Sequence, residues 1–357
     1  MSTIDRRQFL QRMVIFSGGA LATAALLSLL DWSKVESPQL PGDNATPTDN
    51  ATPTDNTTPT DNTTPPDGTT PTDNTTPPDN TTPPDDTTAP AYLAVAHGSS
   101  PTTLVEKAID ALGGIGRFVK SGDDVIIKPN ICVAGRTPQY AATTNPEVVA
   151  ALVALCLGAG ANRVRVMDHP FSGTAEEAYD TSGIAKAVEA AGGKMEVMAS
   201  MKFQNTAIPN GKSITSCLLY RDILEADVLI DVPIAKHHSS PDAVLSLGMK
   251  NLLGVVENRS IYHTETAERV TDLTSLVMPD LTVVDAIRIL TDNGPTGGDL
   301  DDVKQMNTVI VSHDVVAADS YAATLFGKTA ADLPIVRAGA RRGLGTTRFS
   351  RITKIEA

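Results

Sequence analysis

The stretch Asp124-Val125-Ile126-Ile127-Lys128-Pro129-Asn130 indicates how the chain folds. Its short apolar run has the length of a buried strand, and the polar Lys128-Pro129-Asn130 marks the point where that strand ends. A helix is expected next, because Asn145 and Pro146 stand in the order of an N-cap and a first helical residue, and residues 148–157 are mostly apolar. The same succession of apolar strand, polar strand end and helix recurs along the chain.

This recurrence predicts an α/β fold. Further strands are expected at residues 92–96, 163–167, 228–232, 281–284 and 308–311. Further helices are expected at residues 101–119, at 174–191 with a break near Ser182-Gly183, and at 315–326. Asn210-Gly211 is typical of a hairpin turn. Alternating strands and helices favour a mainly parallel sheet covered by helices on both faces, in a single large domain of residues 91–357.

Polar side chains gather at the predicted strand ends. Ligands of such sheets bind outside the carboxyl ends of the strands. The polar residues that follow predicted strands are His97, Lys128, Asn130, Asp168, His169, Lys236, His237, Asp285, His313 and Asp314. Together with His238, these include five of the six histidines of the chain, and only His263 lies elsewhere. We therefore expect one shared site at this edge of the sheet.

Four segments together resemble the family called domain of unknown function 362. They are Ile126-Ile127-Lys128-Pro129-Asn130; Lys236-His237 with Gly248-Met249-Lys250-Asn251-Leu252-Leu253-Gly254; Val283-Val284-Asp285 with Asn293-Gly294-Pro295; and Ala317-Ala318-Asp319. The resemblance covers most of residues 91–357, and its most specific part is the Lys-Asn-x-x-Gly segment. It supports the domain boundaries and the choice of site residues, but it implies no settled activity.

The candidate residues suit the binding of an anion. Those expected to bind ligand are Lys128, Asn130, Asp168, Lys236, Lys250 and Asn251. The lysines would hold a carboxylate or phosphate, and the asparagines would add oriented hydrogen bonds. A structural alternative stays open for Lys250 and Asn251, which would then tie a loop to a helix end.

Proton transfer is expected from His237, Asp285 and Asp319, which are the candidate catalytic residues. Alternatively, His237 and His238 ligate a divalent metal together with carboxylates, although no compact H-E-x-x-H spacing occurs. Two functional classes follow. One is an enzyme that acts on a small anionic substrate by acid–base or metal-assisted chemistry. The other is a tethered protein of the cell envelope that binds such a ligand without turnover.

The chain has three cysteines, Cys132, Cys156 and Cys217, and no C-x-x-C pair. This count excludes a disulfide framework and a four-cysteine zinc or iron–sulfur site. Many members of the resembled family carry a ferredoxin-like cluster module, but the cysteines for one are missing here, so no iron–sulfur cluster is expected. The three residues are interpreted as small buried side chains, with one disulfide as an alternative.

Residues 1–30 resemble a twin-arginine signal. Arg6-Arg7 precedes Phe9-Leu10, and residues 13–30 carry no charge. An ordinary secretory signal is the alternative. Eighteen helical residues rise about 27 Å, which is just enough to cross the hydrocarbon core of a bilayer. The expected partners are the twin-arginine export machinery and the membrane, and residues 13–30 would serve as a signal anchor if they are not cleaved.

Residues 31–90 are predicted to be a disordered stalk. From residue 41 on they contain only Pro, Thr, Asp, Asn, Ala and Gly, in a six-residue repeat. The repeat places asparagines in N-x-T sequons at Asn44, Asn50, Asn56, Asn62, Asn74 and Asn80. Glycosylation is one interpretation of these sequons, and an unmodified spacer is the other.

The acidity of the chain lies mostly in this stalk. Residues 1–40 sum to +1 and residues 41–90 hold nine aspartates, so the formal net charge of −13 leaves about −5 for residues 91–357. A domain with this small negative charge and 4% aromatic residues has no electrostatic footprint for nucleic acid. No nucleic-acid partner is therefore expected.

Overall fold

The computed structural model of the protein describes residues 92–357, so the predicted signal, anchor and stalk lie outside the described residues. The strands are β1 (Leu93–His97), β2 (Asp124–Pro129), β3 (Arg163–Val166), β4 (Lys194–Met195), β5 (Phe203–Ala207), β6 (Ser216–Tyr220), β7 (Val228–Val232), β8 (Ile234–His237), β9 (Leu245–Ser246), β10 (Leu281–Leu290), β11 (Val303–Ser312) and β12 (Lys354–Glu356). The α-helices are α2 (Pro101–Ala111), α3 (Pro146–Gly158), α4 (Ala175–Thr181), α5 (Ile184–Ala190), α6 (Asp222–Glu225), α7 (Gly248–Asn251), α8 (Thr266–Leu276), α9 (Val315–Thr324) and α10 (Pro334–Arg341).

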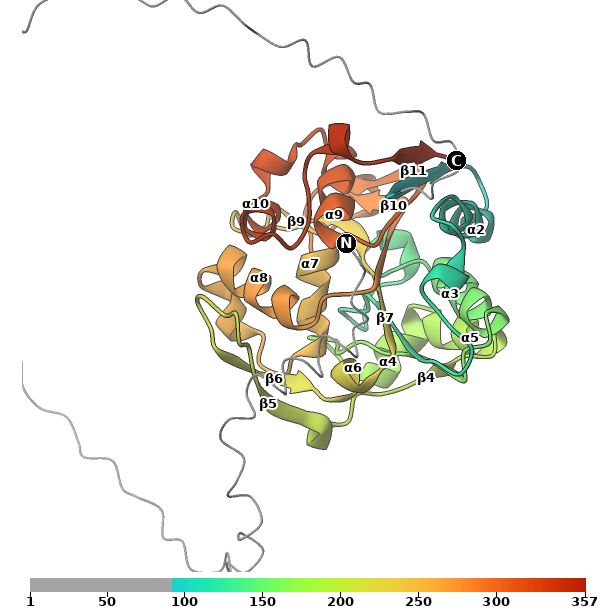
Figure 1. Cartoon of the computed structure of the whole chain (residues 1–357), viewed down its shortest axis with the longest axis horizontal. Coiled ribbons are helices and arrows are strands. Elements are labelled where there is room, and N and C mark those ends of the chain that lie inside the picture. Colours follow the sequence, from blue (N-terminus) through green and yellow to red (C-terminus); the bar gives the residue numbers. More distant parts are fainter. Residues whose placement is uncertain (1–91) are drawn as a thin grey trace, which may run out of the picture. The chain divides into compact units, whose positions relative to one another are not determined.

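One mixed sheet, in the order β12-β1-β11-β10-β7-β2-β3-β4, forms the centre of the domain, and helices cover both of its faces (Figure 1). Side chains of β2 alternate between the two layers, because Val125 and Ile127 belong to one hydrophobic core and Ile126 to the other. Helices α2, α3 and α5 bury the first core, whereas α8, α9 and α10 bury the second. The predicted fold class, a mainly parallel sheet between helices in one domain, is confirmed.

Strand direction corrects one expectation. Neighbours from β10 to β4 pair in parallel, but β11 runs antiparallel to both β10 and β1. Its register places Ser312 opposite Thr282, at the beginning of β10. His313 and Asp314 follow Ser312 and therefore lie at the opposite edge of the sheet from Lys128. They do not belong to the site that the sequence predicted for them.

Glycines decide where two of the predicted helices end or break. One prediction is wrong in its length, and the other is confirmed. The helix expected at 101–119 ends at Ala111, because Gly113 and Gly114 adopt φ values of 95° and 81° that an α-helix excludes. The helix expected at 174–191 is divided into α4 and α5, with Gly183 at φ 71° where the break was predicted.

The remaining local expectations concern the hairpin and the membrane. Strands β5 and β6 pair antiparallel, and Asn210-Gly211 lies in the loop between them, which confirms the predicted hairpin. Within residues 92–357, no helix combines the length and the apolar character needed to cross a bilayer.

Candidate functional site

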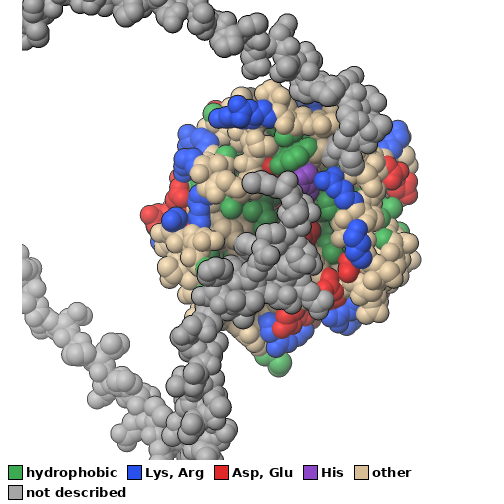
Figure 2. Space-filling view, in the orientation of Figure 1, with side chains coloured by type: hydrophobic (Ala, Val, Ile, Leu, Met, Phe, Trp, Pro, Cys, Tyr) green, Lys and Arg blue, Asp and Glu red, His purple; other side chains and the backbone are tan. Residues whose placement is uncertain are grey.

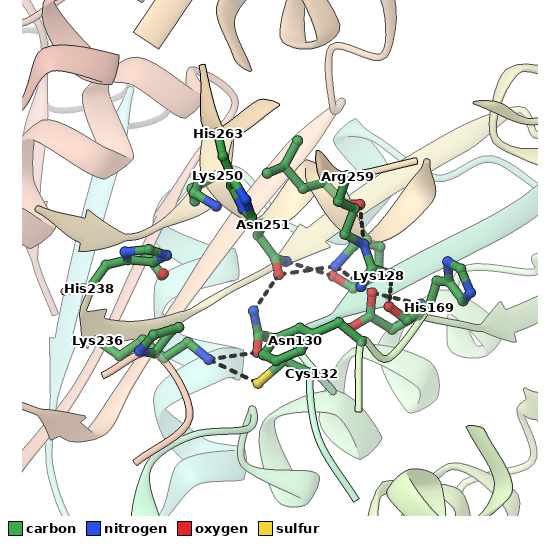
Figure 3. Close-up of a pocket in the computed structure, with 16 residues that line it drawn as sticks. Lys128, Asn130, Cys132, His169, Lys236, His238, Lys250, Asn251, Arg259 and His263 are labelled. Atoms are coloured by element: carbon green, nitrogen blue, oxygen red, sulfur yellow. Dashed lines mark hydrogen bonds and ion pairs between the residues drawn. The ribbon is translucent and has the colours of Figure 1, made fainter. Parts of the chain in front are cut away.

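A cavity of about 330 Å³ lies where β2, β3 and β8 end, and it is closed by α7 and the segment that follows α7 (Figure 3). Cationic and imidazole side chains dominate its polar lining. The cations are Lys128, Lys236, Lys250 and Arg259, the histidines are His169, His238 and His263, and the carboxylate is Asp168. On the face drawn in Figure 2, by contrast, basic and acidic side chains are interspersed over the visible surface.

The floor of the cavity is an ion pair between Lys128 and Asp168. These residues end the parallel neighbours β2 and β3, so the topology brings them together. Lys128 Nζ lies 2.8 Å from Asp168 Oδ1, and the two side chains are 1% and 4% exposed. The carboxylate also accepts hydrogen bonds from the backbone amides of Ile131 and His169. Its charge is thus fully partnered, which a buried ion requires.

Asn251 joins this floor to the neighbouring strands. Its Oδ1 accepts hydrogen bonds from Lys128 Nζ at 3.0 Å and from Asn130 Nδ2 at 2.9 Å. Its Nδ2 donates to Asp231 Oδ1 at 2.8 Å. Asp231 lies in the middle of β7 with no exposed surface, and burial raises the pKa of its carboxyl well above the ordinary value. The sequence signal for Asp231 was a lone acid inside an apolar run, and it was missed.

Lys236 occupies another part of the wall and has no acidic partner among residues 92–357. The residue is 1% exposed, and its Nζ donates to Asn130 Oδ1 at 3.0 Å and to Ala142 O at 2.7 Å. Cys132 Sγ lies 3.2 Å from the same nitrogen. Cys132, Cys156 and Cys217 are all free and buried, as the first interpretation of the cysteines expected, but the contact of Cys132 with the site was not foreseen.

Lys250 and Arg259 supply two further cations, and neither has a carboxylate in ion-pair contact among residues 92–357. Arg259 donates to the backbone oxygens of Leu253 and His169. The Lys250 side chain makes no hydrogen bond or ion pair to any residue in 92–357. Burial first, and then the charges of Lys236 and Arg259, lower the pKa of Lys250 from its ordinary 10.5 to about 8.

Burial and the nearby cations lower the pKa values of all three histidines of the cavity. Burial and the nearby Lys250 and Lys236 lower the pKa of His238 to about 3. Burial and Arg259 lower the pKa of His169, and burial and Lys250 lower that of His263. Near neutral pH the lining therefore carries four cations against one carboxylate. This excess gives the cavity a positive electrostatic potential.

All six predicted ligand-binding residues line this cavity, but His237 does not. Successive residues of β8 point to opposite sides, so Lys236 and His238 face the cavity while His237 faces a separate hollow beside Asp292. The structure therefore does not bring His237 and His238 together as metal ligands. In the described part of the chain, no three His, Cys, Asp or Glu side chains are grouped so as to hold a metal ion. His97 also lies apart, because three strands separate β1 from β2.

Asp285 and Asp319 hold backbone amides instead of lining the cavity. Asp285 accepts from the amides of Asn145 and Ile287, and Asp319 accepts from those of Gly248 and Met249. Burial raises the pKa of Asp285 to about 6 and that of Asp319 to about 7. The prediction that these two carboxylates lie beside the lysines is therefore wrong. No contact in the structure supports a catalytic role for either of them.

At both ends of residues 248–254, which contain the Lys-Asn-x-x-Gly sequence, the close packing of the backbone requires a glycine. A Cβ on Gly254 would lie 1.9 Å from Asp168 Oδ1 and 2.5 Å from Lys128 Nζ. A Cβ on Gly248 would lie 2.7 Å from Val315 Cγ2 and 2.9 Å from Asp319 Oδ1. The segment can approach the ion pair only without these side chains, and the approach places Lys250 and Asn251 at the cavity.

Together, the doubly covered sheet and the cation-lined cavity at its strand ends define an α/β protein with a cavity at the edge of its sheet where the strands end. Residues 125–324 match the family described as "Domain of unknown function (DUF362)", and the chain belongs to this family. The resemblance seen in the sequence is thereby confirmed.

Individual relatives match parts of the chain. A thylakoid-associated protein of Synechocystis sp. is 29% identical over 248 residues, which cover 67% of this chain and 74% of that protein. The lactate racemase apoprotein of Thermoanaerobacterium thermosaccharolyticum is similar at a TM-score of 0.37 and 12% identity, over 62% of this chain and 54% of that one. A Thermotoga maritima protein gives a TM-score of 0.38 and 12% identity, over 65% and 60%. The chain thus spans less than two thirds of either solved chain.

The close approach of Gly254 can be tested by Gly254→Ala. The added methyl group must displace the buried Lys128–Asp168 pair, so we expect a loss of about 1–3 kcal/mol in the free energy of unfolding, measured with denaturant. Gly158→Ala is the control, because a Cβ there meets no atom within 4 Å. It should leave stability unchanged or raise it by up to about 1 kcal/mol. Equal stability of both variants would show that the pair does not need this glycine.

The unpaired charge of Lys250 predicts that Lys250→Met stabilises the protein at pH 7. Its pKa is lower in the folded state, so the unfolded chain binds more protons between pH 8 and 10.5 and the wild type gains stability across that window. The advantage of the variant, about 1–3 kcal/mol, should therefore shrink from pH 8 upward. Lys128→Met is the contrasting variant, because it leaves Asp168 buried without its cation. It should lower the free energy of unfolding by about 3–5 kcal/mol. A similar loss with both variants would contradict an unpaired Lys250.

Proposed function

We propose that the protein is an enzyme that binds a small anionic substrate, a carboxylate or phosphate, in this cavity and acts on it by acid–base chemistry. The observation that carries the proposal is that Lys236, Lys250 and Arg259 line one cavity with no carboxylate in ion-pair contact among the described residues. Cations buried without a counter-ion cost free energy. A bound anion removes that cost.

The dimensions of the cavity support a small substrate. Its volume of about 330 Å³ is at the lower end of the range of about 300–1,000 Å³ found for ligand pockets. The donors come from different elements: Lys236 from β8, Lys250 from α7, and Arg259 from the segment after α7. Donors that converge from separate elements fix the orientation of a ligand as well as its charge.

Groups suited to proton transfer lie in the same wall. Lys250, with a pKa of about 8, changes protonation state close to neutral pH, and His263 beside it is neutral there. These two replace His237, Asp285 and Asp319 as the residues we propose for acid–base steps. A protein that binds the anion without turnover would use the same cavity. Measurement of turnover with a bound acid distinguishes the enzyme from such a binding protein.

Anion binding can be tested by calorimetry with acetate, succinate, inorganic phosphate and glycerol phosphate. Lys236→Met should weaken binding of the best of these by about tenfold or more, because a charge-assisted hydrogen bond contributes about 1.5–3 kcal/mol. Lys186→Met removes an exposed cation of α5 and should leave affinity unchanged. The proposal fails if none of the four anions binds, or if both variants bind as the wild type does.

We also propose that the domain is exported by the twin-arginine route and held at the membrane by residues 13–30. Support comes from Arg6-Arg7 before an uncharged segment and from the thylakoid association stated for the Synechocystis relative. Changing both arginines to lysine should leave the precursor in the cytoplasm, as judged by fractionation and immunoblotting. Export of this variant at the normal level would contradict the twin-arginine route.

A further inference from the structure

The amino group of Lys250 differs from those of the other two lysines in the cavity. Lys128 Nζ contacts Asp168, Asn251 and the backbone oxygen of Pro129. Lys236 Nζ donates to an amide oxygen and to a backbone oxygen, and it lies 3.2 Å from Cys132 Sγ. Lys250 Nζ has no hydrogen-bond acceptor and no ion-pair partner among residues 92–357. In that part of the chain it thus differs from the other two amino groups, whose positions are fixed by their partners.

The surroundings of Lys250 make its ammonium group easier to deprotonate than that of an ordinary lysine. Lys236 and Arg259 repel its proton, and burial adds to the effect, so the pKa of about 8 leaves a substantial neutral fraction in mildly alkaline solution. Figure 3 draws Lys250 and His263 along one side of the cavity and Lys236 with Cys132 along the other. A lysine that is desolvated and next to other cations is a nucleophile, because its lone pair is available.

We propose that Lys250 forms a Schiff base with the carbonyl group of a small oxo acid whose carboxylate is held by Lys236 and Arg259. This inference rests on the proposed function, since it assigns a substrate class to the same anion-binding cavity. In the fraction of molecules in which Lys250 is deprotonated, its amine contributes a lone pair instead of a positive charge. The arrangement then provides two cations for a carboxylate and a separate nucleophile for a carbon atom near it.

The step balances without an oxidant or reductant. The Lys250 lone pair attacks the carbonyl carbon, a C–N bond forms, and the carbonyl oxygen takes up a proton to give a carbinolamine. Loss of that oxygen as water then leaves a protonated imine, so one proton is consumed and one water is released. His263 lies beside Lys250 and is neutral, so it can accept a proton from the attacking nitrogen. The iminium then withdraws electrons from the adjacent carbon.

Borohydride trapping tests the proposal on the full-length protein. Pyruvate, 2-oxobutanoate, acetoacetate and 2-oxoglutarate are each incubated with the protein at pH values from 6 to 9, reduced, and followed by intact mass and peptide mapping. We expect one reduced adduct per chain with at least one acid, on the peptide that contains Lys250, increasing as the pH approaches 8. Lys250→Arg keeps the positive charge and should lose the adduct. Lys186→Met should retain it.

The outcomes separate the inference from the proposed function. If an oxo acid binds with an affinity that depends on Lys236 but no acid is trapped on Lys250, the Schiff base is refuted and the anion site stands. If no oxo acid binds, the Schiff base is refuted, and the anion site is decided separately by calorimetry with acetate, succinate, inorganic phosphate and glycerol phosphate. Labelling spread over exposed lysines such as Lys186, or an adduct that persists in Lys250→Arg, also overturns the assignment of the nucleophile. Circular dichroism of Lys250→Arg establishes that the variant is folded before its result is scored.

Discussion

The buried ion pair between Lys128 and Asp168 is the contact on which the rest of the site depends. Removing two charges from water is costly, so the pair persists only with the additional hydrogen bonds that surround it. Asn251 makes one of these hydrogen bonds. The space beside the ion pair admits only a glycine at position 254. The pair also neutralises Lys128. The positive charge available to a ligand therefore resides in Lys236, Lys250 and Arg259.

Much of the fold could be predicted from the sequence, because strands buried on both faces and the helices between them leave a clear pattern of apolar runs. The antiparallel direction of β11 could not be predicted. A strand's residues do not encode its direction, which here follows from the loop that returns the chain from β10 to pair beside it. His313 and Asp314 followed an apolar run as Lys128 does, yet they stand at the other edge. Hydrophobic periodicity identifies a strand without orienting it.

The candidate site, too, could be predicted only in part from the sequence. The lysines and asparagines at the ends of parallel strands converge, because parallel topology alone brings such positions together. Asp285, within β10, and Asp319, in α9, do not reach the cavity, and their carboxylates accept hydrogen bonds from buried backbone amides. Arg259 and His263 reach the cavity from a segment with no strand before it. Only tertiary packing assigns these two residues to the site.

The four cations and one carboxylate of the lining also bear on the lifetime of the protein. Without an anion, their mutual repulsion opposes the packing of β8, α7 and the following segment around the cavity. A ligand that binds only the folded state adds to stability by mass action, in proportion to the logarithm of its concentration once it exceeds the dissociation constant. Resistance to proteolysis would then follow the supply of that anion. The abundance of the anion would then help to determine how much folded protein survives.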